Sequence, residues 1–301
     1  MKVSARSLLA VGAIAAGAMY TGQAAAQINF GPQVPAKDVH PLVRAAADVS
    51  GLIRTRANTI GNVNLPEIVA NGTMVDLEAA TPGQAVPVSR YVFVVSMHQA
   101  ASRLDFEGPN TPRTIRVVKG NRAWNESWTA DKKKLNTSPA DSAATHRAQM
   151  LFMQPQFWLQ TAALASVKRC WDGKACQVEV KEGTENGKPT LEVPINGVTY
   201  KGTFGADKRI ESIEAMIAMP SGGPKKMVAR FYEWRAGEKT DAGYANPEGP
   251  KALDKFHNGT YWPSRIVHEV DGNKVLDVTL TEGWASPYTV FPEPELLAKG
   301  Q

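Results

Sequence analysis

The sequence has no apolar run long enough to cross a membrane. Its longest apolar run, residues 8–20, has 13 residues, whereas a helix needs about 20 to span the hydrocarbon core. Lys2 and Arg6 precede this run, and the small-residue stretch 23–27 follows it. This order is typical of a secretory signal peptide. We therefore expect residues 1–26 to be removed, and the rest to be a soluble periplasmic protein that does not span a membrane.

The chain also lacks a strong excess of either charge. Lys and Arg number 34 against 29 Asp and Glu, for a net charge of +5. Removal of the two basic residues of the signal leaves +3, so a nucleic-acid partner is not indicated. The composition, 43% hydrophobic and 21% charged, is that of a globular protein. We see no internal repeat or linker, and we predict a single domain over residues 27–301.

Cysteine is scarce, with only Cys170 and Cys176 in the chain. No cysteine stands directly after the small-residue stretch 23–27, so the chain has no acceptor there for lipid attachment. In an exported protein a pair six residues apart can close in an oxidising compartment, and we predict a disulfide that clamps a tight turn. Two free thiols are the alternative. Metal binding is less favoured, because no third cysteine or nearby histidine completes a tetrahedral set.

Familiar catalytic motifs are missing as well. The sequence has no Gly-x-Ser-x-Gly, no His-Glu-x-x-His, no phosphate-binding Gly-x-x-x-x-Gly-Lys and no dinucleotide-binding Gly-x-Gly-x-x-Gly. None of its five histidines has a partner at metal-ligand spacing, so we predict no metal site and no cofactor. His98 and His268 are weak catalytic candidates, with Asp105, Glu107 or Asp277 as a carboxylate partner. A satisfied core or rim histidine is the more usual interpretation of such strand positions.

Period-two alternation dominates the rest of the chain. Tyr91 and Phe93 fall on one face of an expected strand and Val92 and Val94 on the other. Further strands are predicted over residues 102–107, 114–119, 177–181, 191–195, 210–219, 226–234, 264–270 and 274–280. Short turns rich in Gly and Asn, at residues 119–121, 185–187, 195–197 and 271–273, favour antiparallel hairpins.

Two segments have helical periodicity instead. Residues 40–55 predict one helix, and residues 140–167 predict a helical block that breaks near Pro155. The second block is too apolar for a solvated helix, so we expect it to pack on the concave side of the sheet. The Gly- and Pro-rich run 236–249 is interpreted as a long loop between two strands.

Aromatic side chains are abundant for the size of the core. Trp124, Trp158 and Trp262 are predicted ligand-binding residues, because large aromatic side chains line apolar pockets and carry a polar N–H group. Ordinary core packing is the alternative for most of these aromatic residues.

Three segments resemble a known family. These are residues 117–125 (VVKGNRAWN), residues 153–163 (MQPQFWLQTAA) and residues 258–267 (NGTYWPSRIV). They resemble the exported N-terminal accessory domain that precedes some metallo-β-lactamase-fold hydrolases, itself similar to LolA-type periplasmic lipoprotein carriers. The resemblance implies a strand–turn–strand with Trp, a helix that begins at Pro and a late strand that begins around Trp-Pro. The His-x-His-x-Asp-His metal cluster of the hydrolase part does not occur in this sequence.

The periodicities and turns predict an α+β fold, in which helices cover a strongly curved antiparallel sheet, and the resemblance implies that this sheet is a LolA-like half-barrel. Such a concave face can hold an acyl chain. We therefore predict a periplasmic binding or carrier module for an apolar or amphipathic ligand, either a lipophilic small molecule or a lipidated partner. Two alternatives stay open. One is a hydrolase or lyase of unfamiliar type that acts on an exported small molecule. The other is an accessory subunit of a separately encoded metallohydrolase.

Overall fold

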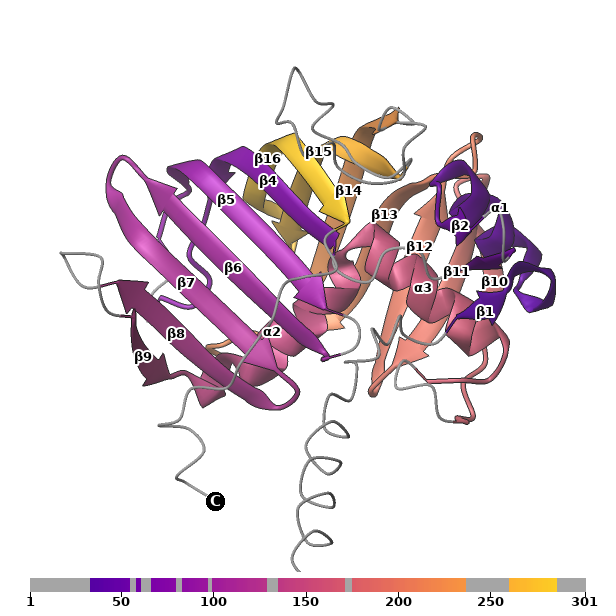
Figure 1. Cartoon of the computed structure of the whole chain (residues 1–301), viewed down its shortest axis with the longest axis horizontal. Helices are drawn as coiled ribbons and strands as arrows, with labels where there is room; N and C mark the ends of the chain where they lie inside the picture. The colour runs from indigo at the N-terminus through magenta and orange to yellow at the C-terminus, as the bar shows by residue number, and fades with distance from the viewer. Residues whose placement is uncertain are drawn as a thin grey trace, which may run out of the picture.

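One large antiparallel sheet dominates the protein (Figure 1). The computed structural model describes residues 33–54, 58–60, 66–79, 83–96, 99–128, 135–170, 175–236 and 260–285. In that part of the chain, thirteen strands pair in the order β10-β11-β12-β13-β14-β15-β16-β4-β5-β6-β7-β8-β9. The end strands β10 and β9 do not pair with each other, so the sheet is not closed.

The strands of this sheet are β4 (Pro66–Met74), β5 (Val86–Ser96), β6 (Ala101–Gly108), β7 (Thr111–Lys119), β8 (Arg122–Trp128), β9 (Leu135–Pro139), β10 (Lys181–Glu185), β11 (Lys188–Ile195), β12 (Val198–Phe204), β13 (Ile210–Ile217), β14 (Lys225–Ala236), β15 (Tyr261–Val270) and β16 (Asn273–Ala285). A small second sheet contains β1 (Val34–Pro35), β3 (Thr59–Ile60) and β2 (Ile53–Arg54). The predicted α+β class and the antiparallel sheet are confirmed.

Hairpins join most neighbouring strands, as the turn residues predict. Asn186 and Gly187, at φ 51° and 77°, connect β10 to β11, and Asn196 and Gly197 connect β11 to β12 in the same way. Positive φ at both turn residues matches the twist of the paired strands. The turns at residues 119–121 and 271–273 also lie in hairpins. Among the described strands of the large sheet, the one pairing between strands that do not follow each other in sequence is β16 with β4, where Leu276 lies opposite Met74.

Four helical segments lie between β9 and β10: η2 (Asp141–Ala143), α2 (Ala144–Met150), η3 (Leu151–Met153) and α3 (Pro155–Ser166). The predicted break at Pro155 is confirmed, because this proline stands at the first position of α3. Helix α2 contacts β6, β7 and β8 on one side and β13 on the other. Helix α3 follows it over β11–β13 (Figure 1). The two helices therefore line the inner face of the bent sheet.

Helix α3 is buried on all sides from Pro155 to Ala165. It lies between the sheet and helix α1 (Pro41–Val49), which it contacts. A helix in this position needs apolar residues on every face. The predicted packing of this block against an apolar surface is thus confirmed.

Several predicted boundaries are wrong. The first helix ends at Val49 rather than residue 55, because Gly51 adopts φ +69°, which ends a helix. The strand predicted over residues 177–181 begins only at Lys181. Strands β4, β8, β9 and β12 of the large sheet, and the three short strands of the small sheet, were not predicted from alternation. In β4 the apolar pattern is interrupted by Asn71 and Gly72, where the pairing register shifts.

The predicted disulfide is confirmed. Cys170 and Cys176 are bonded, with 5.5 Å between their Cα atoms, in the segment that follows α3. The alternative of two free thiols is therefore wrong. None of the helices in the described ranges is long and apolar enough to cross a membrane. The predicted signal peptide and the run 236–249 lie outside the described residues, except for Ala236 at the end of β14.

Candidate functional site

A cavity of about 100 Å³ lies between the inner face of the sheet and helix α2. Its apolar lining combines three methionines with two aromatic residues and leucine side chains. Among them are Met74, Met150, Met227, Tyr91, Phe93 and Leu104. We call this space the inner cavity.

Strand alternation places these side chains. Tyr91 and Phe93 lie on the same face of β5, as the alternation in the sequence predicts, and the centroids of their rings are 6.5 Å apart. Leu104 of β6 lies opposite Phe93 in register and so projects to the same side. Met150 is the last residue of α2. The cavity is therefore enclosed by the sheet on one side and by the end of α2 on the other.

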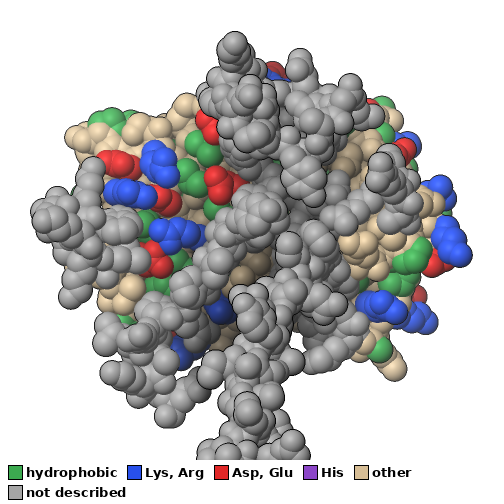
Figure 2. All heavy atoms as spheres, viewed as in Figure 1, with side chains coloured by type: hydrophobic (Ala, Val, Ile, Leu, Met, Phe, Trp, Pro, Cys, Tyr) green, Lys and Arg blue, Asp and Glu red, His purple; other side chains and the backbone are tan. Residues whose placement is uncertain are grey.

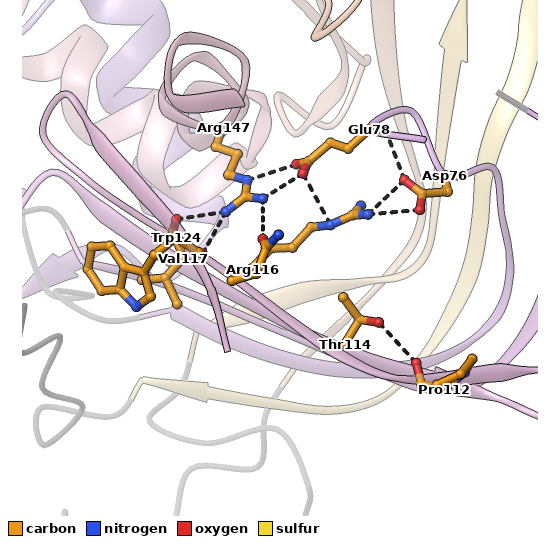
Figure 3. A network of polar contacts seen from close by, with 9 residues as sticks. Asp76, Glu78, Pro112, Thr114, Arg116, Val117, Trp124 and Arg147 are labelled. Atoms are coloured by element: carbon orange, nitrogen blue, oxygen red, sulfur yellow. Dashed lines mark hydrogen bonds and ion pairs between the residues drawn. The ribbon is translucent and has the colours of Figure 1, made fainter. Parts of the chain in front are cut away.

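Arg147 of α2 fastens this helix to the sheet (Figure 3). Its guanidinium donates hydrogen bonds to both carboxylate oxygens of Glu78, at 2.8 and 2.5 Å, and to Oδ1 of Asn125 at 2.6 Å. It also donates to the backbone carbonyls of Val117 and Trp124, at 2.9 and 2.8 Å. These five bonds match the five N–H donors of an arginine. No donor is left for a ligand.

A second arginine extends the same network. The guanidinium of Arg116 in β7 donates two 2.8 Å hydrogen bonds to Asp76 and lies 3.2 Å from Glu78. It also lies 5.1 Å from the ring centroid of Phe106. Two arginines therefore face two carboxylates, and their charges balance. Asp76 and Glu78 belong to the segment after β4, which the network holds against β7 and α2.

The other side of α2 is bound to the end of β13. The amide of Ala218 donates to Oε1 of Gln149 at 2.7 Å, and Nδ1 of His146 lies 2.8 Å from the carbonyl oxygen of Ala218. A ring nitrogen that faces a carbonyl carries the proton, which assigns the Nδ1–H tautomer to His146. Burial holds the pKa of His146 below its ordinary value. Helix α2 thus bridges two distant parts of the sheet across the cavity.

His268 of β15 lies in the cavity wall near His146. It is 3% exposed, and its Nε2 atom has no hydrogen-bond partner in the part of the chain that the structure describes. Burial, together with the nearby His146, lowers the pKa of His268 to about 4. The ring is therefore neutral at pH 7. A buried polar atom without a partner is costly, and a bound polar group would remove that cost.

The carboxylates proposed as catalytic partners are engaged elsewhere. Asp105 accepts hydrogen bonds from Arg90 and Arg113 on the outer face of the sheet, where acidic and basic side chains lie close together (Figure 2, left). Asp277 is bound by Arg265 and Lys274. Glu107 is exposed. Within the described ranges, none of these three carboxylates is brought to His268.

The second catalytic candidate, His98, lies outside the described residues. In the part of the chain that is described, no three His, Cys, Asp or Glu side chains gather as a group that could hold a metal ion.

The three predicted ligand-binding tryptophans are fully buried in the core. Trp158 of α3 covers Gly202 of β12 so closely that an added Cβ atom would lie 2.6 Å from the ring, and Trp262 covers Gly283 with the same spacing. The Nε1 atom of Trp124 donates to Glu126 at 3.0 Å. None of the three lines the inner cavity or the second, larger pocket beside it, which is described next. Their role in ligand binding stays a prediction.

A larger hollow of about 410 Å³ adjoins the inner cavity at the ends of β13–β16. We call it the outer pocket. Val75, Leu77 and Val275 line both spaces. The remaining walls come from residues 83–85, from Met219 and Ser221 after β13, and from Lys225, Val270, Asn273 and Lys274. The two spaces therefore lie side by side, with these three side chains at their common boundary.

Sequence reasoning identified part of this site. It placed Tyr91 and Phe93 on one strand face and singled out His268 on another. It missed Arg147, Arg116 and Glu78. Arg147 is 31 residues from Arg116 along the chain, and Arg116 is 38 residues from Glu78. The sequence carries no local signal for a contact of this kind.

Comparison with models of known protein families finds no match to this chain, and comparison with curated proteins finds no significant one either.

Proposed function

We propose that this protein is an exported, periplasmic binding or carrier protein that holds the apolar part of a lipophilic molecule in the inner cavity. The observation that carries the proposal is the cavity itself. Methionine and aromatic side chains line it, and the unpartnered Nε2 atom of His268 lies in its wall. Pockets that bind small molecules combine an apolar lining with a few polar groups in the same way.

Methionine suits such a site because its unbranched side chain changes rotamer easily and fits irregular shapes. The volume of about 100 Å³ is smaller than the roughly 150 Å³ cavity that accepts benzene. A longer chain therefore requires Met74, Met150 and Met227 to move apart. Each methylene group buried there contributes about 0.8 kcal/mol, so a few of them support useful affinity.

The resemblance to LolA-type carriers supports the same function. An antiparallel sheet that is not closed, with helices along its inner face, is what a half-barrel of that type requires. The three local structures that the resemblance implies are present. They are the β7–β8 hairpin, a helix that begins at Pro155, and β15 with Trp262 and Pro263. The disulfide fits an oxidising compartment.

A matched pair of substitutions tests the proposal. The probe is N-phenylnaphthylamine, a neutral dye that fluoresces in apolar surroundings. Met150→Trp fills the inner cavity with an indole ring, and we expect it to weaken dye binding by about tenfold or more. Met216→Trp is the control, because Met216 is 53% exposed on β13 and lines neither cavity. It should leave dye binding unchanged.

A third variant guards against a folding defect. Met150→Ala enlarges the inner cavity and should bind the dye at least as well as the original protein, with an unchanged circular dichroism spectrum. Equal dye affinity in Met150→Trp and Met216→Trp would show that the dye binds elsewhere and would overturn the proposal. Absence of any saturable dye binding by the original protein would do the same.

A further inference from the structure

The charged side chains of the inner cavity are engaged in ion pairs. Its two arginines, Arg116 and Arg147, face the two carboxylates of Asp76 and Glu78, and all donors of Arg147 are occupied. His146 and His268 are neutral at pH 7, because burial holds both pKa values below the ordinary value. An ionised group that entered this space would lose its hydration, and the carboxylates already balance the charges of the two arginines. The inner cavity therefore suits the uncharged end of a ligand.

The outer pocket has the opposite character. Two lysines, Lys225 and Lys274, line it, together with the hydrogen-bonding side chains of Gln84, Ser221 and Asn273. No carboxylate belongs to the described residues of its lining. Lys225 begins β14 and Lys274 is the second residue of β16, on either side of the turn at Asp271.

The charges of these two lysines are not strongly neutralised. The ammonium of Lys225 lies 3.6 Å from Asp271, and both side chains are about half exposed, which makes the pair weak. Lys274 shares Asp277 with Arg265, which already donates two 2.7 Å hydrogen bonds to that carboxylate. Two cations on one carboxylate leave one positive charge in excess. The outer pocket therefore carries an excess of positive charge, whereas the charges of the inner cavity are balanced.

We infer that the ligand is an anionic amphiphile, whose apolar chain enters the inner cavity while its negatively charged head stays in the outer pocket beside Lys225 and Lys274. This inference rests on the proposed function, because it assigns an orientation and a substrate class to the same site. Val75, Leu77 and Val275 line both spaces, so the two sites adjoin, as the head and the chain of one molecule require. A head group in the outer pocket keeps its contact with water, so binding does not require the charged group to be fully desolvated.

Three amphiphiles with the same chain and different heads test the inference. They are laurate, dodecanol and dodecyltrimethylammonium, each used below its micelle concentration at low salt to displace N-phenylnaphthylamine. We expect laurate to bind about tenfold more tightly than the cation, with dodecanol in between. The preference should shrink as salt is added, because exposed charges are screened.

The variant Lys225→Gln/Lys274→Gln identifies the source of the preference. It should lose about fivefold in laurate affinity and nothing in dodecanol affinity. Lys188→Gln is the control, because Lys188 is half exposed on β11 and pairs with Glu211 away from both cavities.

The possible outcomes separate the two proposals. Equal affinity for all three amphiphiles, or laurate binding that is unchanged in the double variant, would overturn the anionic head while leaving the apolar site intact. Failure of all three to displace the dye would overturn both.

Discussion

Arg147 of α2 and Glu78 of the segment after β4 form a two-point ion pair inside the bent sheet, although 69 residues separate them in sequence. The side chain of Arg147 is 6% exposed and that of Glu78 is 13% exposed. Both line the inner cavity. The pair therefore holds together the helix and the segment that form two of its walls.

Removal of Arg147 should be costly. Arg147→Met leaves Glu78 and two backbone carbonyls without their donors, and a broken buried pair typically costs about 3–5 kcal/mol. We expect a loss of about 3 kcal/mol in the free energy of unfolding, because Arg116 still faces Glu78. Urea unfolding measures it. Lys188→Met, which breaks the exposed pair with Glu211, should cost under about 1 kcal/mol. Equal losses in the two variants would contradict the role assigned to Arg147.

The free energy of unfolding should fall as the pH is lowered through the range in which His268 is neutral in the folded protein but protonated in the unfolded chain. Its pKa is about 4 when folded against an ordinary value of 6.5. Between these values the unfolded chain binds the extra proton, so this contribution is complete above pH 6.5 and is lost as the pH falls toward 4. The difference amounts to about 3 kcal/mol. His146 acts in the same direction.

The variant His268→Met isolates this contribution. Its unfolding free energy, measured by urea at several pH values between 7 and 4, should depend on pH less steeply than that of the original protein. The slope that remains comes from His146 and from carboxylates. Parallel pH profiles for the two proteins would show that His268 is not buried in its neutral form.

The contact between Trp158 and Gly202 should tolerate no added methyl group. Gly202→Ala would place a Cβ atom 2.6 Å from the indole ring, and overpacking of this kind costs about 1–3 kcal/mol. Gly223→Ala is the control, because no atom lies within 4 Å of the position of its Cβ. Thermal unfolding compares the two. If Gly202→Ala is as stable as the control, Trp158 is free to move and its predicted ligand contact gains support.

Loss of the disulfide should weaken the fold modestly. The bond closes a loop between residues six apart, and the chain-entropy treatment gives roughly 2 kcal/mol for a loop of this size. The double variant Cys170→Ser/Cys176→Ser should unfold several degrees lower. Reducing agent should lower the melting temperature of the original protein and leave that of the variant unchanged. An effect of reducing agent on both proteins would exclude the bond as its cause.

The sequence predicted what local patterns determine. Alternation at Tyr91 and Phe93, positive-φ turns such as Asn186–Gly187, and the break at Pro155 each depend on a few adjacent residues. These gave the antiparallel α+β fold, whereas Gly51 shortened the first helix through a conformation that periodicity does not reveal.

The inner cavity, by contrast, is formed by side chains from segments that lie far apart in the sequence. Arg147 reaches Glu78 only because β16 pairs with β4 and α2 crosses the inner face of the sheet. Trp158 and Trp262 could not be separated from ligand-contacting residues in sequence, because a buried tryptophan and a pocket tryptophan look alike there. In the structure the two rings pack over Gly202 and Gly283, whose missing side chains make room for them.

Native mass spectrometry tests the central claim, that the protein holds a lipophilic molecule, most directly. The protein is purified gently from the cells that make it, and bound molecules are extracted and identified. We predict one bound lipophilic molecule per protein, with an acidic head group, or uptake of laurate by a preparation that has lost it. A protein that stays at its own mass after incubation with laurate and with dodecanol would contradict the account.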